Sequence, residues 1–159
     1  MRRTITVILL ILLTLLIGCS KTPEMNNNYY LLLMGESNTW KVDSYELSIT
    51  PDTLKAGNGT LTMKNETEYQ TEYINMEVHA VIDNKDTVIQ STAVSGSHTS
   101  IAQINTGSIE GGTFYNKDGK AIELANISDI YMTVEWQENT GSKKNITETI
   151  YLYGKNKNQ

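Results

Sequence analysis

The chain has 159 residues, of which 18 are acidic and 13 are basic, and its formal net charge at pH 7 is −5. This length suits one domain of ordinary size. Because contact with nucleic-acid phosphates requires a basic surface, the acidic balance argues against a nucleic-acid partner. It argues equally against purely electrostatic adhesion to an anionic membrane surface.

The N-terminal segment has the order of a bacterial signal peptide. Met1-Arg2-Arg3 is basic, and residues 5–17 are uncharged and mostly leucine and isoleucine. A short apolar run behind a basic start is typical of a cleaved signal. The run has about 13 residues, fewer than the roughly 20 that a membrane-spanning helix needs. An uncleaved membrane anchor is the alternative interpretation.

The only cysteine of the chain, Cys19, ends the stretch Leu16-Ile17-Gly18-Cys19 directly behind this run. The stretch resembles the lipobox of bacterial lipoproteins. The resemblance implies that residues 1–18 are removed by a cut between Gly18 and Cys19. It also implies that Cys19 carries lipid, palmitate among its acyl chains, on the extracytoplasmic face of the cell membrane. A buried or disulfide-bonded cysteine is the alternative, although a lone cysteine cannot pair within its own chain.

The chain that would remain after such a cut is more acidic than the whole. Its 18 acidic residues are balanced only by the lysines, because both arginines, Arg2 and Arg3, lie in the signal. The net charge is therefore about −7. Lysine, asparagine, threonine and isoleucine are abundant, which is typical of a Gram-positive bacterium with an AT-rich genome. We therefore expect the partner to be an envelope protein, peptide or glycan.

Residues 19–35 are predicted to form a lipidated tether, residues 36–155 the folded domain, and residues 156–159 a disordered tail. About 17 extended residues reach at most ~55–60 Å. Six consecutive apolar residues, Tyr29-Tyr30-Leu31-Leu32-Leu33-Met34, are unusual for a tether. They are consistent with a first strand, a strip on the membrane, or a helical turn docked on the domain.

The stretch Gly35-Glu36-Ser37-Asn38-Thr39-Trp40-Lys41-Val42 resembles the start of the domain in small uncharacterised lipoproteins of Bacillus-like bacteria. These proteins share a Gly-Glu-Ser-x-x-Trp stretch after a lipobox and a tether. The resemblance implies lineage and architecture but no activity. Physically, Gly35 would end the tether and Trp40 would anchor the first strand in the core.

From Trp40 onward, apolar residues recur with period two, which predicts half-buried β-strands. Glycine and asparagine turn signals, such as 57–59, 83–86 and 96–97, separate the strands. The expected strands are near 39–50, 59–65, 72–83, 86–94, 98–105, 107–115, 120–125, 129–138 and 144–153. This pattern predicts an all-β fold, an antiparallel two-sheet sandwich that is immunoglobulin-like in general shape. The cysteine and tryptophan pattern of true immunoglobulin domains is missing.

The last two strands also predict a register. Keeping their apolar residues on one face pairs Trp136 with Ile146, Met132 with Ile150, and Ile130 with Leu152. Tyr131 then lies opposite Tyr151 on the outer face. A slip by one residue would put the two apolar sets on opposite faces. In this register Glu148 points inward beside Val134, which indicates a sheet end or a bulge.

Residues with catalytic or metal-binding potential are few. His79 is expected on an outer strand face beside Glu77, a pair that could bind a metal or move a proton but is more often solvated. His98 is expected in a turn after Gly96-Ser97. The chain has no zinc-site, metalloprotease or nucleophile-elbow motif. We therefore predict no catalytic residue, no metal site and no cofactor.

Two groups of acidic residues leave alternatives open. The 83–86 segment offers oxygen ligands, but calcium requires six or more and the EF-hand spacing is absent, so a turn is favoured. Glu66, Glu68 and Glu72 surround Tyr69 and Tyr73, and paired carboxylates can cleave glycosides when a cleft brings them to a defined spacing. Sequence alone does not establish such a cleft.

Four tyrosines are expected on outer strand faces: Tyr73, Tyr131, Tyr151 and Tyr153. Outward aromatic residues can form a recognition patch for a protein or a glycan. The alternative is ordinary cross-strand pairing. Together these features predict a membrane-anchored, non-catalytic binding or accessory module of the cell envelope. An immunity-type lipoprotein that sequesters an antimicrobial peptide and a small carboxylate-based envelope hydrolase are the alternative functions.

Overall fold

A computed structural model describes residues 27–138 and 144–154. The signal segment, the lipobox with Gly18 and Cys19, most of the predicted tether and the predicted tail at 156–159 lie outside the described residues. The strands are β1 (Tyr29–Glu36), β2 (Trp40–Ile49), β3 (Thr53–Gly57), β4 (Thr60–Met63), β5 (Gln70–Ile82), β6 (Lys85–Ser100), β7 (Gln103–Asn105), β8 (Ser108–Gly112), β9 (Ile127–Gln137) and β10 (Asn145–Gly154), with one 3₁₀ turn, η1 (Leu124–Asn126). Within these ranges, no helix has the length and apolar character needed to cross a membrane.

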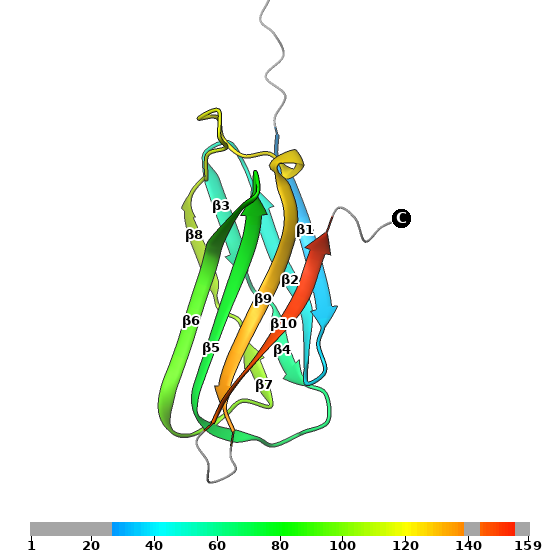
Figure 1. The fold of residues 1–159 in the computed structure, drawn as a ribbon, viewed down its shortest axis with the longest axis vertical. Coiled ribbons are helices and arrows are strands. Elements are labelled where there is room, and N and C mark those ends of the chain that lie inside the picture. Colours follow the sequence, from blue (N-terminus) through cyan, green and yellow to red (C-terminus); the bar gives the residue numbers. More distant parts are fainter. Residues whose placement is uncertain (1–26, 139–143, 155–159) are drawn as a thin grey trace, which may run out of the picture.

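The strands form two antiparallel sheets that pack face to face, so the predicted all-β sandwich is confirmed (Figure 1). In sheet A, β2 pairs with β1 along one edge and with β3 and β4 in succession along the other. β8 pairs with β3, and β7 pairs with β4. Sheet B has the order β10-β9-β5-β6 and faces the viewer in Figure 1.

One hydrophobic core fills the space between the sheets, because alternate residues of each strand point inward. The largest fully buried side chains are Trp40, Tyr45, Leu47, Ile49, Leu61, Ile74, Ile101, Ile122, Ile127, Ile130, Met132 and Ile150. The period-two sets predicted in β5 and β9 are buried throughout. The sequence pattern therefore identified the inner face of sheet B correctly.

A buried polar chain connects the sheets on the side where β6 lies. The Tyr45 hydroxyl donates to Gln90 Oε1 at 2.6 Å, and Gln90 Nε2 donates to the carbonyl of Thr106 at 2.8 Å. Burial raises the pKa of the Tyr45 phenol far above its ordinary value, so the hydroxyl stays protonated and remains a donor. The Tyr45 hydroxyl and the Gln90 amide are therefore both hydrogen-bonded despite their burial.

The predicted boundary between tether and domain at residue 36 is too late. Residues 29–36 form β1, which pairs with β2 from Tyr29 opposite Ile49 to Glu36 opposite Lys41. Leu33 is buried in the core, whereas Tyr30, Leu32 and Met34 are exposed. The apolar run is therefore an edge strand of the sandwich, because it completes the sheet beside β2.

Other strand predictions were wrong in the middle of the chain. Strand β3 was not expected, and η1 with an isolated bridge occupies the segment at 120–125 where a strand was expected. The predicted strand 86–94 lies within β6, which continues through Gly96-Ser97 to Ser100, and the predicted strand 98–105 is divided between the end of β6 and β7. The Gly96-Ser97 turn signal marks an irregularity in the register, since Tyr73 lies opposite Ser95 but Thr71 lies opposite Thr99. His98 therefore lies in a strand and not in a turn.

The register of β9 and β10 was predicted correctly over most of its length. Trp136 lies opposite Ile146, Met132 opposite Ile150, Tyr131 opposite Tyr151, and Val134 opposite Glu148. The predicted pair of Ile130 with Leu152 was wrong, because a bulge between Tyr151 and Tyr153 places Tyr153 opposite Ile130. A bulge inserts one extra residue and shifts every later partner.

Candidate functional site

The four tyrosines predicted to form a patch divide into three locations. Tyr131 and Tyr151 lie side by side on the outer face of sheet B, with ring centroids 6.1 Å apart. Tyr73 is six residues from His79 along β5, about 20 Å away at strand spacing. Tyr153 packs against the hydrophobic core, so its predicted outward position is wrong. The bulge before Tyr153 is the reason, because it aligns this residue with the inward Ile130.

His79 joins the two tyrosines in a compact cluster. Its ring stacks on Tyr131 with the centroids 4.7 Å apart and the planes 7° from parallel. His79 Nδ1 lies 3.0 Å from Asp86 Oδ2, and the Tyr131 hydroxyl donates to Asp86 Oδ1 at 2.9 Å. Both Asp86 oxygens are therefore used to hold two aromatic rings in place. Only 9% of the His79 surface is exposed.

The protonation states in this cluster follow from its hydrogen bonds. Burial, the hydrogen bond to Asp86 and the nearby negative charge raise the pKa of Tyr131, which keeps the phenol protonated. An ionised carboxylate can only accept hydrogen bonds, so His79 Nδ1 must be the donor to Asp86. In neutral His79 the buried Nε2 is then an acceptor without a hydrogen-bond partner, 3.6 Å from Glu77 Oε2.

Sequence reasoning paired His79 with Glu77 on the outer face, and the structure confirms that placement. It missed Asp86, which was assigned to a turn. The turn itself is shorter, since the positive φ angles fall on Asp83 (48°) and Asn84 (66°) and β6 begins at Lys85. An Asp-Asn two-residue hairpin is a recognisable signal and could have placed Asp86 on the strand beside His79.

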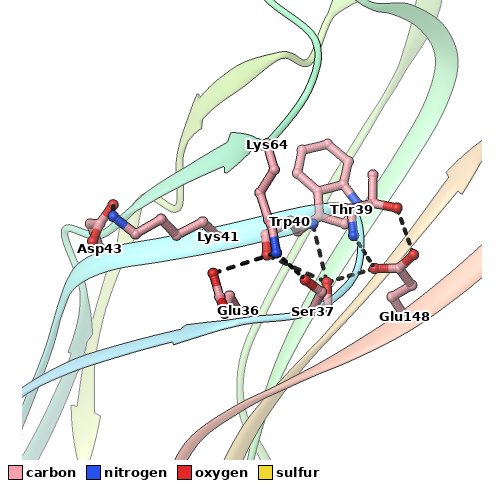
Figure 2. A network of polar contacts seen from close by, with 8 residues as sticks. All are labelled: Glu36, Ser37, Thr39, Trp40, Lys41, Asp43, Lys64 and Glu148. Carbon is pink, nitrogen blue, oxygen red and sulfur yellow. Dashed lines mark hydrogen bonds and ion pairs between the residues drawn. The ribbon is translucent and has the colours of Figure 1, made fainter.

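A second polar cluster surrounds Glu148, the residue that the predicted register left pointing inward (Figure 2). Ser37 Oγ donates to Glu148 Oε2 at 2.6 Å, and Thr39 Oγ1 donates to Oε1 at 2.6 Å. The Thr39 backbone N–H donates to Oε2 at 3.0 Å. Lys64 Nζ donates to the Ser37 carbonyl at 2.9 Å and lies 3.5 Å from Glu36. Glu148 thus ties β10 to the turn between β1 and β2.

The Gly-Glu-Ser-x-x-Trp stretch is explained by these contacts. A Cβ on Gly35 would lie 2.4 Å from the Tyr151 carbonyl oxygen, so β1 approaches β10 too closely there for a side chain. Glu36 pairs with Lys64, Ser37 binds Glu148, and Trp40 is fully buried. The stretch closes one side of the sandwich, which is a structural role.

The charge of Glu148 should stabilise the fold in a pH-dependent way. Partial burial alone would raise the pKa of Glu148. The hydrogen bonds from Ser37 and Thr39 and the charge of Lys64 lower this pKa by more than burial raises it, so the net effect is a lowered pKa. A carboxylate whose pKa is lowered in the folded state stabilises the fold at pH values above its unfolded-state pKa of about 4.3. This stabilisation is lost as the pH falls through the lower pKa of the folded state. We expect Glu148→Gln to reduce the free energy of unfolding by about 1–2 kcal/mol at pH 7.

Urea unfolding of both proteins between pH 7 and pH 3 measures this effect. The difference between wild type and Glu148→Gln should shrink below about pH 4, where the wild-type carboxylate becomes protonated. Glu68→Ala, at an exposed position, is the control and should change stability by less than about 0.5 kcal/mol. A difference that stays constant with pH would contradict the role of the charge.

The outer face of sheet A has a depression of about 580 Å³ beside the exposed Tyr30. Its two carboxylates are engaged by neighbouring side chains: Asn58 donates to Glu46 at 2.8 Å, and Lys55 pairs with Glu110 at 3.0 Å. The hydrogen bonds from Asn58 and Tyr30 lower the pKa of Glu46. Glu46 is thus held as an ionised acceptor.

The acidic residues of the two other predicted groups lie near opposite ends of β5. Glu66, Glu68 and Glu72 are exposed in and beside the segment that connects β4 and β5. Asp83 binds the backbone N–H of Lys117 and the amide of Asn126. Across residues 27–138 and 144–154, no three His, Cys, Asp or Glu side chains are grouped so that they could hold a metal ion.

Comparisons of the chain with protein-family models, curated proteins and solved structures find no match. The geometry must therefore carry the functional argument by itself. The cluster of Tyr131, Tyr151, His79, Asp86 and Glu77 combines exposed aromatic surface with fixed polar groups, and it is our candidate functional site.

Proposed function

We propose that this protein is a lipid-anchored, extracytoplasmic lipoprotein that serves as a non-catalytic binding module in the envelope of a Gram-positive bacterium. The lipobox-like stretch that ends in Cys19 supports the anchor. The candidate functional site on sheet B supports the binding role. The lipid would hold the domain at the membrane and leave this face available to an envelope partner.

The observation that carries the binding role is the order imposed on outward aromatic residues. Tyr131 is held by Asp86 and by stacking on His79, while 53% of its neighbour Tyr151 is exposed. Aromatic side chains with few rotatable bonds lose little conformational entropy on binding, and prior fixing reduces this loss further. A tyrosine on an ordinary sheet surface does not require a buried histidine ring stacked against it, as His79 is stacked against Tyr131.

The position of β1 shortens the reach of the domain. Because the sandwich begins at Tyr29, about ten residues separate it from Cys19, and these can span at most ~35 Å. The earlier expectation of a 17-residue tether gave a maximum reach of ~55–60 Å. A partner must therefore lie within a few nanometres of the membrane surface.

Substitution of Cys19 tests the anchor. Wild-type protein from a Gram-positive host should sediment with membranes, and mass spectrometry of its N-terminal peptide should show a diacylglyceryl group on Cys19. We expect Cys19→Ala to lack this mass and, where residues 1–18 have been removed, to leave the membrane fraction almost completely. A lipid anchor contributes about 0.8 kcal/mol per buried methylene, so its loss has a large effect.

Ser20→Ala is the matched control, since it changes a neighbouring small residue and keeps the thiol. It should sediment and carry lipid as the wild type does. A wild-type N-terminal peptide with a free thiol would overturn the proposal. So would full membrane retention of a processed Cys19→Ala protein.

A further inference from the structure

The outer faces of the two sheets differ in how their carboxylates are neutralised. Between described residues, lysine forms ion pairs at Lys41–Asp43, Lys55–Glu110 and Lys64–Glu36, all on sheet A or beside it. The outer positions of sheet B carry four carboxylates: Glu77, Asp86, Asp129 and Glu135. None of these four is paired with a lysine among the described residues. Lysine therefore accompanies carboxylates on sheet A, whereas these four carboxylates of sheet B have no lysine partner among the described residues.

The registers of sheet B arrange this charge around the aromatic residues. Tyr151, Tyr131, His79 and Val88 lie opposite one another in β10, β9, β5 and β6 and form one row across the sheet. On one side of the row, Val81 lies opposite both Asp86 and Asp129. On the other side are Glu77, opposite Thr133, and then Glu135, opposite Asn75. An apolar and aromatic track thus runs between two acidic borders.

A ring nitrogen of His79 without a hydrogen-bond partner lies beside one of these carboxylates. Nε2 has no hydrogen-bond partner, and the nearest charged group is the Glu77 carboxylate, 3.6 Å away. A buried polar nitrogen normally has a hydrogen-bond partner. The Glu77 side chain is 36% exposed and can reach a ligand on the surface. An ammonium or guanidinium group at the surface would pair with the Glu77 carboxylate.

We propose that the outer face of sheet B binds a cationic peptide segment in an extended conformation. This inference rests on the proposed binding role and specifies its partner. Lysine or arginine side chains on either side of the peptide would meet the carboxylates that border the row. Their cationic groups would also pack on the exposed ring of Tyr151, since cations are attracted to aromatic faces.

The dimensions of the face define a probe. At the strand spacing of 4.7–4.9 Å, four strands span about 15 Å, which about five extended residues cover. We would use a fluorescein-labelled peptide of about eight residues that alternates lysine and serine. The same peptide with glutamate in place of lysine is the negative probe. Fluorescence anisotropy with the full chain in neutral detergent measures binding without dependence on the membrane.

Two variants with the same change in net charge distinguish the faces. The sheet B variant combines Glu77→Gln, Asp129→Asn and Glu135→Gln and leaves Asp86 to hold His79. The sheet A variant combines Asp43→Asn, Glu46→Gln and Glu110→Gln. We expect the first to weaken lysine-peptide binding about tenfold and the second less than about twofold, because local charge complementarity outweighs distant charge at moderate salt.

Tyr151→Ala provides a test that leaves every carboxylate in place, and it should weaken binding about threefold or more. Circular dichroism of each variant establishes that the sandwich is intact. No saturable binding by the wild type, equal losses in the two triple variants, or equal binding of the glutamate peptide would each overturn the inference. Because the assay is independent of lipid on Cys19, these outcomes leave the lipid anchor standing, and loss of that anchor leaves the binding result valid.

Discussion

Replacing Trp40 with alanine should lower the free energy of unfolding by about 3–5 kcal/mol, the usual range for a large aromatic residue in a packed core. Trp40 lies on β2 in sheet A, and none of its surface is exposed. Its ring meets Trp136 of sheet B edge to face, with centroids 5.4 Å apart and planes at 83°. The substitution therefore opens a cavity and removes an aromatic contact between the two sheets.

Urea unfolding followed by circular dichroism measures this loss. Tyr115→Ala is the control, because 69% of Tyr115 is exposed, and it should change stability by less than about 0.5 kcal/mol. Trp40→Phe should lose less than Trp40→Ala. It retains an apolar ring and removes an indole Nε1 that is buried without a hydrogen-bond partner. A Trp40→Ala loss below about 1 kcal/mol would show that the core does not depend on this contact.

The second large effect is expected at Gly57, where β3 ends. Its φ of +131° is disfavoured for residues with a side chain. A Cβ there would lie 2.1 Å from the Gly107 carbonyl oxygen and 2.5 Å from Ser108 Cα. These are backbone atoms that cannot rotate away. We expect Gly57→Ala to cost about 2–5 kcal/mol through strain and overpacking together.

Gly111→Ala is the matched control on the neighbouring strand β8. A Cβ at Gly111 would have no atom within 4 Å, so the stability change should be within about 0.5 kcal/mol. Thermal unfolding of both variants gives the comparison. Equal midpoints for the two would mean that the β3–β8 edge adapts to a side chain, contrary to the close packing at Gly57.

Several features of the fold were readable from the sequence because they depend on local pattern. Alternating apolar residues in β5 and β9 identified the inner face, since side chains of a strand point to opposite sides. The same periodicity set most of the β9–β10 register, because a one-residue slip would have exposed the apolar set. It also placed His79 beside Glu77 on the outer face.

Other features were not readable because they depend on contacts between distant segments. The run at 29–34 is apolar on both sides, so its pattern cannot distinguish a strand from a membrane strip, and only pairing with β2 resolves it. The bulge that turns Tyr153 toward the core leaves no local signal. Glu148 pointed inward without a visible partner, because Ser37 and Thr39 lie more than 100 residues away in the chain.

The sequence by itself determined an acidic, all-β chain with a lipobox-like stretch at Cys19, since composition and period-two patterning require no tertiary contact. Only the tertiary structure decided which side chains lie together on the outer face of each sheet. Pairing of β5 with β6 and β9 brings Asp86, His79 and Tyr131 together from three strands, and among the described residues lysine pairs only with carboxylates on sheet A or beside it. A surface is assembled from residues that strand order makes neighbours, and strand order is a property of the whole sandwich.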